Sequence, residues 1–143
     1  MNRLAAFLCS FLLVLPMATA KNHPASNDQA SQIAHGKYLV DHVSMCGDCH
    51  SPHDARGGIP SSQYLKGAKL EFHPDHSVPG FASVAPAIAG LPGWSMAKAV
   101  RLLMSGMGKD GKPLAPPMPA FRMSHEDAEA VVAYLKSLHA GSK

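Results

Sequence analysis

Apolar residues recur at helical spacing in three segments of the chain. In the first segment, Ile33, Gly36, Val40 and Val43 are three or four residues apart, which places them on one face of a helix. Asn and Asp at positions 27–28 are good N-cap residues, because their side chains accept hydrogen bonds from the free N–H groups of a first turn. The pattern predicts a helix that begins there and ends where the sequence MCGDCHSPHD begins.

The segment GWSMAKAVRLLMSG predicts a second helix, with Met96, Val100 and Leu103 as its apolar stripe. Ser95 can cap its N-terminus, and Gly106 offers the left-handed conformation that ends many helices. Both ends of this helix are therefore marked in the sequence.

The segment MSHEDAEAVVAYLKSLHAG gives the clearest helical pattern. Ser124 followed by Asp127 resembles a capping box with a shorter acid, and acidic residues crowd the first turn, where the helix dipole favours them. Gly141 follows the predicted end of the helix. The residues expected on its apolar face are Ala128, Val131, Val132, Leu135 and Leu138.

The middle of the chain is rich in glycine and proline. Residues 52–93 hold 12 of the 24 glycines and prolines and show no sustained helical or alternating period. Three short helices would bury little apolar surface, and small domains with thin cores need an additional source of stability. A large apolar cofactor wrapped by loops would supply the missing core.

The N-terminus has the pattern of a secretory signal peptide. Arg3 is followed by an apolar run from Leu4 to Leu15, and residues 18–20 form a small-x-small cleavage site. An uncleaved anchor is the alternative, but a membrane span needs about 20 apolar residues and this run is shorter. We expect residues 1–20 to be a cleaved signal peptide, residues 21–27 a flexible leader, and residues 28–143 the folded domain, exported to a bacterial periplasm.

The charge of the mature chain argues against nucleic acid as a partner. Removal of Arg3 with the signal peptide leaves 12 Lys and Arg residues against 10 Asp and Glu residues, without a basic run or basic patch. No segment after residue 20 is apolar enough to span a membrane, so we expect no transmembrane segment in the mature chain.

The sequence CGDCH, residues 46–50, admits three interpretations. Structural zinc needs four ligands, and the mature chain holds no second cysteine pair, while the adjacent Cys49 and His50 are awkward ligands for one tetrahedral ion. A thioredoxin-like dithiol follows a strand in a βαβ unit, whereas here a helix precedes the motif. Both interpretations are therefore disfavoured, although nine histidines keep zinc open by count alone.

The third interpretation is covalent haem attachment, which is the usual meaning of C-x-x-C-H. The spacing lets the thiols of Cys46 and Cys49 form thioethers with the two vinyl groups at one edge of the haem, and His50 then presents its imidazole to the iron. Covalent attachment also retains the cofactor outside the cell. The motif thus predicts one covalently bound haem c.

With this motif and the helices around it, the chain resembles the class I c-type cytochromes. The resemblance covers roughly residues 28–140 and rests on CGDCH after a helix, a Pro- and Gly-rich middle, GW before a short helix, and PPMPAFRMSHEDAEAVVAYLKSL. The last segment is similar to monohaem domains that accompany bacterial periplasmic dehydrogenases. The resemblance implies a small all-α fold of about three to five short helices and loops around the haem, with Gly36, Tyr134 and Leu135 at the crossing of the first and last helices.

The resemblance also implies a methionine sixth ligand in the loop before the last helix. Met118 matches that position, and Pro117 and Pro119 stiffen the loop around it. Met123 is the second candidate, but it adjoins the Ser124 cap and is expected to pack against the last helix. Met96 and Met104 are expected to fill gaps in the core, and Met107 follows the second helix in a glycine-flanked turn.

Several other residues remain open between a role at the haem and an ordinary structural role. The Pro60 carbonyl could orient the proximal imidazole or merely form a turn. Trp94 could contact the haem, donate its N–H to a propionate, or simply pack in the core. The histidines expected to be solvated are His42, His53, His73, His76, His125 and His139.

With both axial positions filled by protein, no iron site is open to a substrate, and outer-sphere electron transfer remains. The resemblance therefore implies an electron carrier or an electron-transfer subunit of a dehydrogenase complex, not an enzyme. Its partners would be redox proteins, namely a donor dehydrogenase and a membrane or oxidase acceptor. The alternative is a haem-based sensor or enzyme whose iron opens when the distal methionine leaves.

Overall fold

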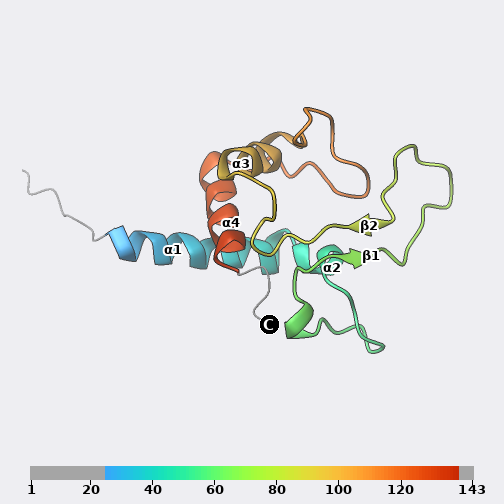
Figure 1. The fold of residues 1–143 in the computed structure, drawn as a ribbon, viewed down its shortest axis with the longest axis horizontal. Coiled ribbons are helices and arrows are strands. Elements are labelled where there is room, and N and C mark those ends of the chain that lie inside the picture. The colour runs from blue at the N-terminus through green and yellow to red at the C-terminus, as the bar shows by residue number, and fades with distance from the viewer. Residues whose placement is uncertain (1–24, 139–143) are drawn as a thin grey trace, which may run out of the picture.

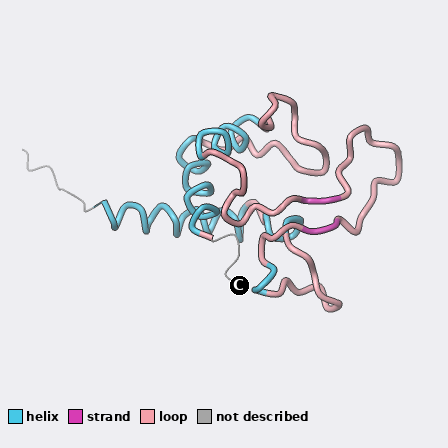
Figure 2. Tube along the Cα trace, viewed as in Figure 1, coloured by secondary structure: helices cyan, strands magenta, loops and turns pink. Residues whose placement is uncertain are grey.

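The computed structural model of the protein describes residues 25–138, in which helices alternate with long loops (Figures 1 and 2). The predicted signal peptide, His139 and Gly141 lie outside the described residues. Within residues 25–138, no helix is long and apolar enough to cross a membrane.

The first predicted helix is present as α1, Ala25–Tyr38, which begins slightly before the expected cap at positions 27–28. It continues directly into a π-helical turn, η1, Leu39–Val43. Met45 then adopts a left-handed conformation with φ 46°, and this bend begins the short helix α2, Cys46–His50. The helix therefore ends at the motif, as the sequence predicted, but through a π-helical turn that the sequence did not indicate.

The predicted caps of the two later helices are confirmed. In α3, Met96–Ser105, the Ser95 hydroxyl accepts a hydrogen bond from the Lys98 N–H at 3.4 Å, and Gly106 ends the helix with φ 70°. In α4, His125–Ser137, the Ser124 hydroxyl accepts from the Asp127 N–H at 3.1 Å.

The glycine- and proline-rich middle contains only short elements. They are the 3-10 helix η2, Ser61–Gln63, and a two-stranded antiparallel sheet of β1, Ala68–Lys69, and β2, Val84–Ala85. Ala68 pairs with Ala85 and Lys69 with Val84. The regular structure within residues 25–138 is thus mostly helical with one very small sheet, which confirms the fold class predicted from the sequence.

Helices α1 and α4 cross in close contact, as the family resemblance implied (Figure 1). A Cβ placed on Gly36 would lie 1.9 Å from the Ala130 carbonyl oxygen and 2.9 Å from the Tyr134 Cβ. Real Cβ atoms do not approach so closely, so a glycine is needed at this crossing.

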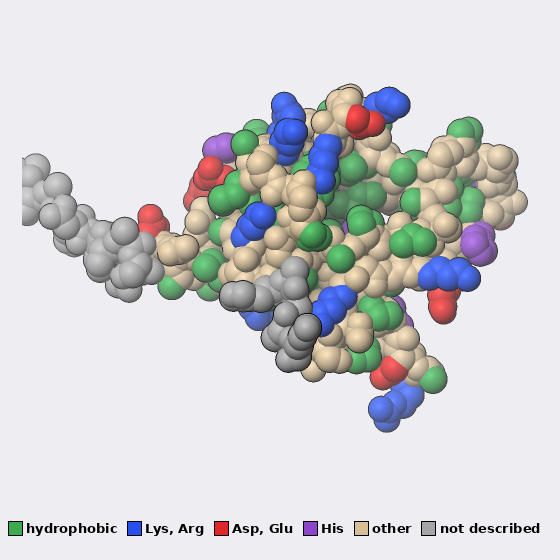
Figure 3. Space-filling view, viewed as in Figure 1, with side chains coloured by type: hydrophobic (Ala, Val, Ile, Leu, Met, Phe, Trp, Pro, Cys, Tyr) green, Lys and Arg blue, Asp and Glu red, His purple; other side chains and the backbone are tan. Residues whose placement is uncertain are grey.

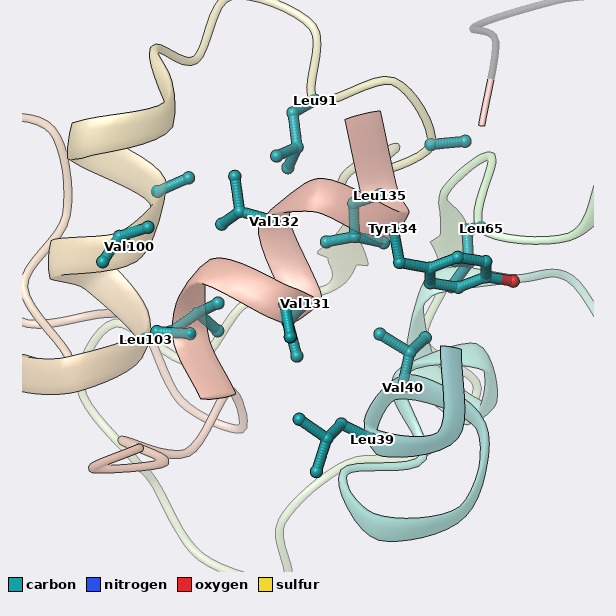
Figure 4. Packing of buried hydrophobic residues seen from close by; sticks show 14 residues of the cluster. Leu39, Val40, Leu65, Leu91, Val100, Leu103, Val131, Val132, Tyr134 and Leu135 are labelled. Atoms are coloured by element: carbon teal, nitrogen blue, oxygen red, sulfur yellow. The ribbon is translucent and has the colours of Figure 1, made fainter. Parts of the chain in front are cut away.

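The apolar core is centred on α4, with α1 and η1 on one side and α3 on the other. Figure 4 shows Val131, Val132 and Leu135 of α4 between the side chains of α3 and those of η1. The surrounding buried residues include Leu39, Val40, Leu65, Leu91, Val100 and Leu103.

The prediction that Met96 and Met104 fill gaps in the core was wrong. Met96 is 52% exposed and Met104 is 39% exposed. Ala99, Val100 and Leu103 already form the buried face of the three-turn helix α3. Met96 lies at the first turn, beyond that face, and Met104 lies to one side of it.

Candidate functional site

A cavity of about 540 Å³ lies between the helices and the loops of the middle segment. This volume is within the range of about 300–1,000 Å³ that is usual for cofactor and ligand sites. Its lining comes from α2, β2, α3, α4 and the loops, and apolar side chains gather between α3 and the strands on the face shown in Figure 3. Asp48 is the one carboxylate among the described residues that line it, and no Lys or Arg is among them.

The two cysteines and the histidine of the predicted haem motif line this cavity together. Cys46, Cys49 and His50 are all on α2, whose five residues form little more than one helical turn. Both cysteines are half-buried, and neither forms a disulfide. A single short helix therefore presents two thiols and an imidazole to one apolar space.

The orientation of His50 is fixed by a backbone carbonyl. The His50 Nδ1–H donates a hydrogen bond of 2.7 Å to the Pro86 carbonyl oxygen, which can only accept. The other ring nitrogen, Nε2, is therefore left with its lone pair in the neutral ring, the form that binds a metal. Burial lowers the pKa of His50, and the bond to Pro86 only partly opposes this, so the neutral form is favoured.

The proposed role of Pro60 as the partner of His50 was wrong. The Pro60 carbonyl accepts from the Gln63 N–H at 2.8 Å instead. Pro86, 36 residues after His50, reaches the imidazole because it directly follows β2 in the small sheet. The Gly67 N–H before β1 also donates to the His50 carbonyl at 2.8 Å, so residues flanking both strands hold His50.

The protonation of Cys46 distinguishes it from a reactive dithiol cysteine. Burial raises the pKa of the Cys46 thiol to about 11. Redox-active cysteines of C-x-x-C motifs have lowered pKa values, because the thiolate is the reactive form. The environment of Cys46 therefore argues against a thioredoxin-like function.

Met118 lines the same cavity as the haem motif. It lies on the loop between α3 and α4, is half-buried, and is flanked by Pro117 and Pro119, which also contact the cavity. The loop is tied to the segment before β2 by the Ala82 N–H, which donates to the Pro116 carbonyl at 2.7 Å. The structure thus brings Met118 together with Cys46, Cys49 and His50.

The other candidate methionines are not among the residues that line the cavity, namely Met96, Met104, Met107 and Met123. Met123 packs against the core cluster, and its N–H donates to the Leu103 carbonyl at 3.1 Å. This arrangement agrees with the packing role that the sequence indicated for Met123.

The structure shows the core packing of Trp94, and its contact with the haem stays a prediction. Trp94 lines the cavity and also packs against the core cluster. The Lys109 ammonium lies 4.4 Å from the centre of its ring, and Lys136 donates to its carbonyl at 3.1 Å. No local signal in the sequence could have indicated either lysine, because both contacts join distant segments.

The remaining described histidines do not assemble a metal site. Those expected to be solvated, His42, His53, His73, His76 and His125, are exposed. Within residues 25–138, no group of three or more His, Cys, Asp and Glu side chains is placed to hold an ion. The described residues therefore offer no four-ligand set for zinc around Cys46 and Cys49.

The donor set and the cavity together fit haem c. A flat, apolar ring system needs an apolar space of this size, two thiols for thioether bonds, and nitrogen or sulfur donors for iron. Cys46, Cys49, His50 and Met118 provide these groups in one cavity. When haem is bound, this apolar lining would exclude water from its iron.

Comparison with known proteins supports this assignment. The cytochrome c family model matches residues 33–139. A fructose dehydrogenase cytochrome subunit from Gluconobacter japonicus is 30% identical over 110 residues, which is 73% of this chain and 22% of that protein. The chain thus spans about a fifth of the length of this relative.

Proposed function

The chain belongs to the cytochrome c family of electron-transfer haem proteins, and we propose that it is an exported carrier with one covalently bound haem c. In this proposal Cys46 and Cys49 form the thioethers, and His50 and Met118 are the axial ligands. The carrier receives single electrons from a donor dehydrogenase, or another redox enzyme, and delivers them to a membrane or oxidase acceptor.

The observation that carries the proposal is the convergence of these four residues on one apolar cavity. Met118 is 68 residues after His50 in the sequence, and the two line the same space. A closed iron site needs two protein donors, and this cavity offers one from α2 and one from the loop before α4.

Each residue has a distinct part in this function. Haem c supplies a one-electron iron couple when it is bound. The two cysteine sulfurs retain the ring, the Pro86 carbonyl holds the His50 imidazole in orientation, and the neutral Met118 thioether favours reduced iron. One electron enters from a donor, which is oxidised, and one leaves to an acceptor, which is reduced, while the chain binds no substrate at the iron.

The relative supports a dehydrogenase as donor. That protein is named as the cytochrome subunit of fructose dehydrogenase. We propose the same kind of donor here, a dehydrogenase, without assigning its substrate.

The test begins with the protein purified from the periplasm of a host that attaches haem c. We expect its N-terminus at Lys21, an intact mass increased by one haem, and a reversible titration that transfers one electron. A mass without covalent haem would contradict the proposal. So would iron that cannot be reduced and reoxidised.

A sensor or enzyme of the alternative type would differ in its response to carbon monoxide. Its reduced form would bind carbon monoxide rapidly, because an axial position would be open. A carrier with Met118 in place would resist carbon monoxide in the same assay.

A further inference from the structure

Gly106 contacts the methionine loop on both sides of Met118. It ends α3 in the left-handed conformation, with φ 70°, and it is buried. Its carbonyl accepts a hydrogen bond of 3.0 Å from the N–H of Leu114, which lies before Met118. A Cβ placed on Gly106 would lie 2.5 Å from the Cβ of Ala120, which lies after Met118.

The contact with Ala120 leaves no room for a side chain. A separation of 2.5 Å between carbon atoms is about 1 Å shorter than ordinary van der Waals contact, which is about 3.5–4.0 Å. The Ala120 Cβ is attached directly to the backbone, so no rotamer change can move it away. Any side chain at position 106 must therefore displace the backbone of the loop.

Helix α3, which ends at Gly106, is held in place by its own packing. Helix α3 packs against α4 and lines the cavity with Ala99, Leu102 and Leu103. The Met123 N–H also donates to the Leu103 carbonyl at 3.1 Å, which ties the end of the loop to the same helix. A displacement of the loop from the end of α3 is thus a displacement of Met118 relative to the cavity.

We propose that Gly106 is a positioning residue for the Met118 sulfur. Because it has no side chain, the loop over residues 114–121 can lie directly against the end of α3, and this contact sets the depth of the thioether in the cavity. Ligand positions at metal sites must be held to within about 0.5 Å, so a shift of about 1 Å matters. The inference rests on the proposed role of Met118 as the sixth ligand.

The test compares Gly106→Ala with Gly111→Ala. Gly111 also has a left-handed backbone, with φ 76°, but no heavy atom lies within 4 Å of a Cβ placed there. Both variants carry the same backbone cost, and only Gly106→Ala creates the collision. The readout is the weak red absorption band of sulfur-ligated ferric haem, which the family leads us to expect, together with the reduction potential.

We expect Gly106→Ala to lose most of the red band and to shift the potential downward, while Gly111→Ala keeps both. The double variant Gly106→Ala/Ala120→Gly removes the colliding atom and should recover a substantial part of the band. Equal bands in the two single variants would overturn the inference. So would a loss in Gly106→Ala that the second substitution does not restore at all, because the cause would then be the backbone conformation.

If Gly106→Ala does not accumulate with haem, Ala120→Gly alone provides the test. It loosens the contact from the loop side and leaves position 106 unchanged. The oxidised variant should bind added imidazole several-fold more tightly than the natural protein, and an unchanged affinity would overturn the inference. A natural protein without a red band would instead overturn the proposed role of Met118, and with it the inference.

Discussion

At the scale of single residues, the imidazole of the proposed ligand His50 depends on groups that are distant in the sequence. The Pro86 carbonyl decides which ring nitrogen carries the proton, and Gly67 holds the backbone of the same residue. The haem motif identifies the imidazole, but its orientation comes from the small sheet. The sequence thus led to the proposal of His50 as a ligand, and the structure shows the carbonyl group that orients its ring.

Replacement of Met118 by alanine tests the sixth ligand. We expect Met118→Ala to abolish the red band and to lower the reduction potential, because the neutral thioether stabilises reduced iron. Met123→Ala is the matched control: Met123 packs outside the cavity, so its loss should reduce stability and leave the band intact. The assignment is wrong if Met123→Ala, and not Met118→Ala, removes the band.

Asp41 is a largely buried carboxylate held by two donors. The Tyr64 hydroxyl and the Lys37 ammonium both donate to it. Burial alone would raise the pKa of Asp41, but the hydrogen bonds from Lys37 and Tyr64 outweigh burial and lower it. The Tyr64 ring also lies close to Gly47, the second residue of α2, so this cluster supports the haem motif.

The substitution Asp41→Asn should destabilise the protein in a pH-dependent way. Because the pKa in the folded state is below the ordinary value of 3.8, the carboxylate stabilises the fold above that pH. This contribution is lost as the pH falls through the lowered value. We expect a loss of about 1–3 kcal/mol at neutral pH, as is typical for hydrogen bonds to a charged group.

Thermal unfolding of the natural protein and the Asp41→Asn variant at pH 7 and below pH 3 measures this effect. The difference between the two proteins should be large at pH 7 and should shrink in acid. Asp75→Asn, at a fully exposed loop carboxylate, is the control and should change stability by less than about 0.5 kcal/mol. A difference that is the same at both pH values would contradict the role of the Asp41 charge.

At the scale of secondary-structure elements, the sequence correctly predicted the helix ends that depend on nearby residues. The caps Ser95 and Ser124 and the stop at Gly106 were all found, because each depends on a few neighbouring residues. The strands β1 and β2 were missed, because two residues each are too few to show an alternating period. The exposure of Met96 was missed because a helical stripe does not tell where the neighbouring element ends, and that of Met104 because it lies to one side of the buried face.

The crossing of α1 and α4 depends on the absence of a side chain at Gly36. A Cβ in Gly36→Ala would meet the backbone carbonyl of Ala130, which no rotamer change can relieve. We expect a loss of about 3 kcal/mol or more, the upper range for overpacked cores. Urea unfolding followed by circular dichroism measures it.

Ser31→Ala on the exposed part of α1 is the control for this substitution. It introduces the same residue into the same helix and should change stability by no more than about 0.5 kcal/mol. If Gly36→Ala were as stable as Ser31→Ala, the close crossing would not exist in solution.

At the scale of the whole molecule, the cavity explains why the protein core looks too small from the sequence. The buried residues cluster around α4, and α2, α3, α4 and the middle loops also face the cavity of about 540 Å³. An apolar cofactor in this space would join elements that otherwise contact each other little. The glycine- and proline-rich composition of the middle segment already indicated that the core lacks apolar material. The sequence could not show the shape of the cavity.

Loss of both cysteines proposed to attach haem, Cys46 and Cys49, should therefore unfold much of the protein. We expect Cys46→Ala/Cys49→Ala to lack covalent haem and to show reduced helix content and low resistance to protease, since small domains with thin cores depend on such cofactors. The single variants retain one thioether position and should be intermediate. A double variant with the helix content and unfolding temperature of the natural protein would show that haem is not part of the core.

The most direct test of a closed electron-transfer site is the absorption spectrum of the purified protein, recorded oxidised, then reduced, then reduced with carbon monoxide. An iron held by His50 and Met118 predicts the red band in the oxidised form and a reduced spectrum that carbon monoxide does not change. A missing red band together with rapid carbon monoxide binding would contradict it.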